Sequence, residues 1–164
     1  MILGFTFGVF AHVVISLVGI FAGFVVACGL LSGKRLDGWT AWFLITTVLT
    51  SVTGFFLPAD RILPSHIVGA LSLVILAVTI PARYKFRMAG VWRLTYVIGA
   101  MLSLYFNVFV LVVQLFLKVP SLHSLAPKGE EPPFAVAQGC VLVGFIALTT
   151  IAAKRFRLAP SLAT

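Results

Sequence analysis

The sequence predicts an all-α protein, an integral membrane bundle of five transmembrane helices in a single domain. The first observation is composition: the 164 residues are 61% hydrophobic and 10% charged, with a mean hydropathy of +1.15. Soluble domains carry about 25% charged residues. The second is that the apolar residues form long uncharged runs rather than amphipathic stripes. The third is that the basic residues cluster at the ends of these runs.

Five uncharged runs mark the expected spans, within a domain of residues 1–157. They cover approximately residues 7–31, 40–57, 65–82, 94–117 and 134–153. Because about 20 helical residues cross the hydrocarbon core, the first, fourth and fifth runs are long enough to span it. The second and third are shorter, and a re-entrant segment at either place is the alternative. Residues 158–164 are expected to form a loose C-terminal tail.

The distribution of charge predicts the orientation of the bundle. Nine basic residues fall on one side, in the first and third connections and the tail: Lys34, Arg35, Arg83, Lys85, Arg87, Arg93, Lys154, Arg155 and Arg157. The other side carries Arg61, Lys118 and Lys128, together with Asp60, Glu130 and Glu131. Since cytoplasmic loops are rich in Lys and Arg, the N-terminus is expected outside and the C-terminus in the cytoplasm. The net charge of +8 does not indicate nucleic-acid binding, because no recognition motif accompanies it.

Small residues line one face of the first span. Gly19, Gly23 and Ala27 recur at a spacing that lets two helix backbones approach closely. We expect them to pack against another helix, either within the chain or in a homo-oligomer. His12 falls on the same face, so its imidazole is expected to point into the bundle.

Polar side chains in the expected outer half of the membrane form a candidate ligand pocket. Those of the fourth span share one helical face, which must be shielded from lipid because an unpaired amide in hydrocarbon costs several kcal/mol. A weaker face of Thr46, Thr50 and Thr53 in the second span is expected to bond to its own helix. The candidate pocket residues are His12, His66, Tyr96, Ser103, Asn107, Gln114 and Gln138.

Three functional hypotheses fit this pattern. In the first, the polar faces join partner helices, and the protein is an accessory or interaction subunit, or an assembly factor, within the membrane. In the second, it is a channel or transporter whose outer pocket binds a small solute or ion. In the third, it is a redox protein in which His12 and His66 bind a b-type haem or a quinone. The expected partners are the lipid bilayer and other membrane helices, in a homo-oligomer or a larger complex.

The sequence does not favour an enzyme. It contains no nucleophile–base pair, no HExxH motif and no phosphate-binding glycine loop. Cys28 and Cys140 belong to no metal-binding motif and are expected near opposite membrane surfaces. No catalytic residue and no metal ligand is therefore predicted.

Three stretches of the chain carry a resemblance to other proteins: "HVVISLVGIFAG", "TTVLTSVTGFFLPADRILPSHIVG" and "YFNVFVLVVQLFLKVPSLHSLAP". They resemble small multi-pass membrane proteins of proteobacteria, and the resemblance covers most of the chain. It implies a bacterial inner-membrane protein. It brings no activity, so no functional residue is carried over.

Overall fold

The structure is a computed structural model that describes residues 7–57 and 64–157. Over these residues it contains helices and no strands, as the sequence predicts. The helices are α1 (Phe7–Leu31), α2 (Asp37–Gly54), α3 (Pro64–Tyr84), α4 (Val91–Lys118), α5 (Pro120–His123) and α6 (Pro132–Arg155). The expected charged pair Asp60 and Arg61 and the expected tail lie outside the described residues.

Four of the described helices, α1, α3, α4 and α6, are long and apolar enough to cross a membrane. The chain is therefore that of a membrane protein. α2 occupies the second predicted run but is less apolar, because it carries Asp37, Ser51 and five threonines. It also begins three residues before the predicted run, since a carboxylate in the first turn favours a helix N-terminus.

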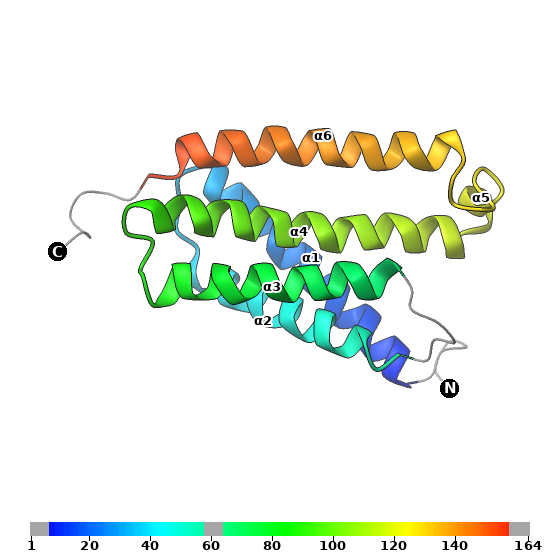
Figure 1. Ribbon diagram of the computed structural model, residues 1–164, viewed down its shortest axis with the longest axis horizontal. Helices are drawn as coiled ribbons and strands as arrows, with labels where there is room; N and C mark the ends of the chain where they lie inside the picture. The colour runs from blue at the N-terminus through cyan, green and yellow to red at the C-terminus, as the bar shows by residue number, and fades with distance from the viewer. Residues whose placement is uncertain (1–6, 58–63, 158–164) are drawn as a thin grey trace.

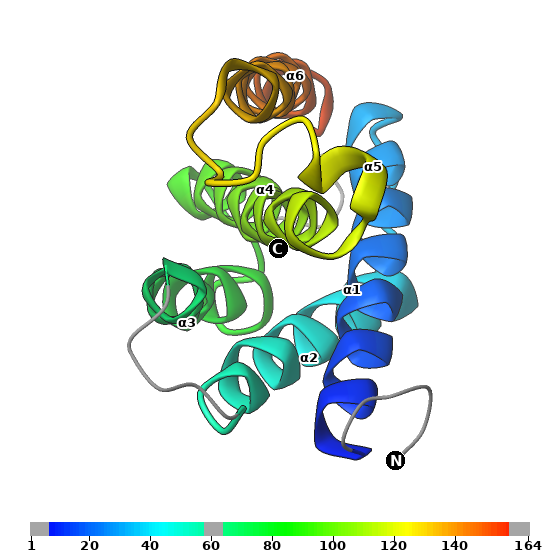
Figure 2. The same cartoon turned by 90° about the vertical axis from the view of Figure 1, so that its right-hand side faces the viewer.

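α4 is the central helix of the bundle. α3, α4 and α6 run side by side, with α4 between the other two (Figure 1). α1 packs against α2, α4 and α6, whereas α3 packs against α2 and α4. Viewed along the bundle, α2 lies between α1 and α3 (Figure 2). The largest fully buried side chains come mainly from α2, α3 and α4, and include Phe43, Leu76 and Tyr96.

The small-residue face of α1 packs within the chain. A Cβ atom on Gly19 would lie 3.0 Å from Thr46 Oγ1, and one on Gly23 would lie 2.5 Å from Leu104 Cδ1. Ala27, on the same face, is also buried. These three positions therefore hold α1 against α2 and α4, and they are not left free for a second copy of the chain.

The helix directions bring the nine basic residues named above to one end of the bundle, on the left in Figure 1. We call this the basic end. Arg93 ties α4 to the end of α6 there, because its Nη1 donates to the carbonyl oxygen of Ala153 at 3.0 Å and to that of Phe156. The opposite end carries Lys118, α5 and the loop that leads into α6.

Candidate functional site

Two threonines of α2, Thr47 and Thr53, are hydrogen-bonded to polar side chains of neighbouring helices, whereas the buried hydroxyl of Thr50 between them has no partner among the described residues. Thr47, Thr50 and Thr53 follow one another at three-residue spacing, which keeps them on one side of the helix; we call them the threonine row. Asn107 Nδ2 of α4 donates to Thr47 Oγ1 at 3.2 Å. His12 Nδ1 of α1 lies 2.8 Å from Thr53 Oγ1. Both side chains thus point into the bundle and bond to α2.

The hydroxyl of Thr53 determines how His12 is hydrogen-bonded. Thr53 Oγ1 donates its only hydrogen to the carbonyl oxygen of Leu49 at 2.7 Å, within its own helix. With its hydrogen directed to a carbonyl of its own helix, Thr53 Oγ1 accepts from His12, and we infer that the Nδ1 atom of the ring carries a hydrogen. In the neutral ring, Nε2 keeps its lone pair. The threonines of α2 were expected to hydrogen-bond within their own helix, but Thr53 also binds His12 of α1.

Ser103 and Gln138 are placed near this region but are bonded differently. Ser103 is fully buried, and its hydroxyl has no hydrogen-bond partner among the described residues. Gln138 Nε2 donates to the carbonyl oxygen of Phe109 at 3.1 Å, which joins α6 to α4. Its Oε1 atom is buried without a partner in the part of the chain that is described. Gln138 thus links two helices and does not reach the threonine row.

Two residues of the candidate pocket, Tyr96 and Gln114, are not brought to the threonine row. Tyr96 is at the basic end, eleven residues from Asn107, or about 16 Å along the helix. Sharing a helical face did not bring the two to the same depth. Gln114 is exposed. It lies about 10 Å beyond Asn107, at the level where α2 ends at Gly54, so α2 does not cover it.

The two histidines of the haem hypothesis approach α2 from different sides. His66 of α3 stacks on Phe55, with ring centroids 5.8 Å apart and planes at 17°. His12 of α1 bonds to Thr53, and α2 stands between α1 and α3 (Figure 2). A haem held by both imidazoles needs both rings to face one iron, so these residues do not fit a shared haem. In the described ranges, no three His, Cys, Asp or Glu side chains lie close enough together to hold a metal ion.

The most extensively bonded polar group lies at the basic end, around Arg83. Although its side chain is only 2% exposed, the guanidinium has three partners. Nη2 pairs with Asp37 Oδ1 of α2, Nη1 donates to Met88 Sδ at 3.2 Å, and Cζ lies 4.9 Å from the centroid of the Tyr96 ring. We call Asp37, Thr40, Arg83, Met88 and Tyr96 the arginine cluster.

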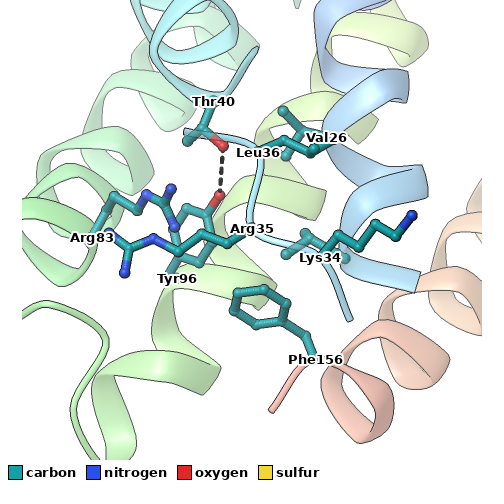
Figure 3. Close-up of a pocket in the computed structure, with 9 residues that line it drawn as sticks. Val26, Lys34, Arg35, Leu36, Thr40, Arg83, Tyr96 and Phe156 are labelled. Atoms are coloured by element: carbon teal, nitrogen blue, oxygen red, sulfur yellow. Dashed lines mark hydrogen bonds between the residues drawn. The ribbon is translucent and has the colours of Figure 1, made fainter. Parts of the chain in front are cut away.

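The arginine cluster joins three helices where they emerge at the basic end. Tyr96 of α4 and Thr40 of α2 are hydrogen-bonded through their hydroxyls at 3.3 Å, beside Arg83 of α3 (Figure 3). A narrow cleft borders the cluster, but the space between its side chains does not admit a water molecule. The arrangement therefore fixes helices in place, and it leaves no room for a ligand in the cleft.

The arginine cluster is missing from the sequence prediction, in which Arg83 served only as a charge that orients the bundle. One signal was present in the sequence. Asp37 is the single acidic residue in a region with nine basic residues, and this imbalance could have indicated an ion pair with one of them on electrostatic grounds. The choice of Arg83 as partner depends on how α2 and α3 pack.

Comparison with known proteins adds no assignment. The chain matches no protein-family model, no curated protein and no solved structure.

Proposed function

We propose that this protein is an accessory subunit or assembly factor of the bacterial inner membrane, which acts by binding another membrane helix through α6. The observation that carries the proposal is the contrast between the interior and α6. His12, Asn107 and Gln138 bond to groups of neighbouring helices, as side chains that hold a bundle together do. In α6, only 6% of the most apolar 18-residue stretch is buried, against 44% in α1 and α4.

The outward face of α6 has the residues that favour close packing of membrane helices. Gly139, Cys140, Gly144 and Ala147 are exposed, and a Cβ atom on either glycine would meet nothing within 4 Å. Small residues at a helix surface let a second backbone approach, and van der Waals contact then stabilises the pair. α1 uses the same device inside the chain, at Gly19 and Gly23.

Crosslinking through Cys140 in native membranes tests this proposal. A Cys28→Ser chain retains Cys140 on α6 as its single cysteine, and we expect a bifunctional thiol–amine crosslinker to give a defined adduct of higher mass. The Cys140→Ser chain, with Cys28 exposed on α1, should give none. Changing Gly139 and Gly144 together to leucine should abolish the adduct. Ala70→Leu, at an exposed position of α3, should leave it unchanged.

Two results would overturn the proposal. In one, the Cys140 adduct forms equally well after both glycines are replaced by leucine. In the other, the adduct has the same yield from Cys28 as from Cys140. An adduct at twice the 17.7 kDa chain mass would identify the partner as a second copy, and any other defined mass would identify a different subunit.

We further propose that α2 is the fifth crossing and that the N-terminus lies outside. α2 is about 27 Å long at a rise of about 1.5 Å per residue, close to the roughly 30 Å hydrocarbon core. Its two ends are bonded to neighbours at both ends of the bundle, through Thr40 to Tyr96 and through Thr53 to His12. The nine basic residues at one end support a cytoplasmic C-terminus. A C-terminal fusion to a reporter active only in the cytoplasm should be active, and an inactive fusion would contradict this orientation.

A further inference from the structure

A groove lies between α2 and α3. It is lined by Ala41, Leu44, Ile45, Val48 and Leu49 of α2 and by Ile80 and Tyr84 of α3. Its volume is about 350 Å³, within the range of about 300–1,000 Å³ typical of ligand sites. We call it the α2–α3 groove. Apart from the hydroxyl of Tyr84, its lining side chains carry no polar group.

Contacts at both ends of the groove fix the spacing between α2 and α3. At the basic end, the pair between Arg83 and Asp37 joins α3 to α2. At the opposite end, a Cβ atom on Gly69 of α3 would lie 3.6 Å from the Phe55 ring. Between these contacts, the α2 side of the groove extends from Ala41 to Leu49, a rise of about 12 Å along the helix. One leaflet of the hydrocarbon core is about 15 Å thick, so the groove covers most of the depth of one leaflet.

The groove ends next to a surplus of positive charge. Tyr84, which lines its end, lies in sequence between Arg83 and Lys85. Arg35 joins the same group through its 2.8 Å ion pair with Asp37. Arg83 and Arg35 therefore share the single carboxylate of Asp37, and Lys85 has no ion pair among the described residues. This leaves the group with two positive charges in excess. Lys85 and Arg35 are exposed and can reach a group at the membrane surface.

We propose that the α2–α3 groove is a binding site for an anionic phospholipid. An acyl chain lies along Ile45, Val48 and Ile80, and the phosphate is held at the basic end by Lys85 and Arg35, with the Tyr84 hydroxyl as a further donor. An apolar channel that ends in unneutralised cations has the chemistry of such a lipid, because basic pockets between membrane helices bind anionic headgroups. A zwitterionic lipid would fill the groove equally well but would gain less from the cations.

Tryptophan fluorescence in bilayers of stated composition tests the site. The three tryptophans are Trp39, Trp42 and Trp92, and Trp42 is an exposed neighbour of Ala41 on α2. With Trp39→Phe and Trp92→Phe, Trp42 remains as the single fluorophore. In mixed bilayers, brominated phosphatidylglycerol should quench it with a relative binding constant about fivefold or more above that of brominated phosphatidylcholine.

Matched variants distinguish lipid binding at a defined site from attraction of the lipid by general surface charge. Lys85→Ala should lower the preference for the anionic lipid about fivefold. Lys154→Ala removes a basic residue of the same end, but from α6, and should leave the preference unchanged. Ala41→Phe should fill the groove and reduce quenching by both lipids. Ala147→Phe, the same change on the exposed face of α6, should not. If Ala41→Phe does not fold, Ile45→Phe at the exposed rim of the groove serves instead.

Three results would overturn the proposal. The first is equal quenching by the two brominated lipids in the unmodified groove. The second is an equal loss of preference in Lys85→Ala and Lys154→Ala, which would mean that the lipid responds to diffuse surface charge only. The third is unchanged quenching when the groove is filled. The site does not depend on partner binding through α6, because the purified chain in lipid bilayers is sufficient for the measurement.

Discussion

Replacing Gly23 with alanine adds one methyl group at the point where α1, α2 and α4 meet. The new Cβ atom would lie 2.5 Å from Leu104 Cδ1 and 2.9 Å from Phe43 Cε2, whereas apolar carbons pack at about 3.5–4.0 Å. Leu104 and Phe43 are each 1% exposed, so neither can move into free space. The helices must separate by about 1 Å, or both side chains must leave their rotamers.

Two opposing contributions determine how much the substitution changes the free energy of unfolding. Overpacking a filled core costs about 1–3 kcal/mol, and removing a glycine from a helix interior contributes about 0.5–1 kcal/mol of stability. The difference between these terms is about 0–2.5 kcal/mol, and we expect Gly23→Ala to lower the free energy of unfolding by about 1 kcal/mol. Gly144→Ala is the matched control, because nothing lies within 4 Å of its Cβ position. It should raise the free energy of unfolding of the isolated chain by about 0.5–1 kcal/mol.

Reversible unfolding of the purified chain in mixed detergent micelles, followed by circular dichroism, measures both values. The comparison is internal, since both variants make the same chemical change in a helix of the same protein. The packing argument would be refuted if Gly23→Ala were as stabilising as Gly144→Ala. That result would mean that α1 does not approach α2 and α4 as closely as described.

Three further predictions concern individual polar groups. Asp37→Ala leaves the buried Arg83 without its anion, so it should lower the free energy of unfolding in the same micelles by about 1–3 kcal/mol. This loss is smaller than the roughly 3–5 kcal/mol expected when a fully buried ion pair is broken, because Asp37 is 66% exposed. Lys154→Ala, a charge removed from the exposed end of α6, should change the free energy of unfolding by less than about 0.5 kcal/mol. In ¹⁵N NMR spectra at neutral pH, His12 should carry its hydrogen on Nδ1, and Thr53→Val should release this preference; an Nε2–H ring in the unmodified chain would contradict the hydrogen bond to Thr53. Backbone N–H donors of Lys128 and Glu130 lower the pKa of Glu131. These hydrogen bonds therefore stabilise the loop fully above the ordinary glutamate pKa of about 4.3. The stabilisation is lost as the pH falls through the lowered pKa of Glu131. The protection of the Lys128 amide against hydrogen exchange, taken relative to its intrinsic rate at each pH, should fall in that range. Glu131→Gln should make this protection independent of pH.

The helical class and the positions of the helices could be predicted from the sequence because they depend on local patterns. Uncharged runs of about 20 residues have few structural alternatives in a membrane. The separation of charges also followed from the alternation of helix direction, and the structure brings the C-terminal ends of α1, α3 and α6 to one end of the bundle (Figure 1). The inward direction of His12 and Asn107 followed from helical periodicity, since both bond to α2.

The candidate pocket could not be predicted in the same way, because it depends on how far each helix is shifted along its axis. Tyr96 and Asn107 share a face of α4, yet Tyr96 bonds to Thr40 near the start of α2 and Asn107 bonds to Thr47 farther along it. Gln114 shares that face as well, but α2 ends at its level. Periodicity gives the direction of a side chain, whereas its neighbours depend on tertiary packing.

The hydrogen bond between Asn107 and Thr47 offers the most direct test of whether polar side chains join the helices of this bundle. A double-mutant cycle with Asn107→Leu, Thr47→Val and the double variant isolates the energy of this pair. We predict a favourable coupling of about 0.6 kcal/mol, within the range measured for hydrogen bonds between membrane helices. A coupling of zero, with both single variants as stable as the original chain, would contradict it.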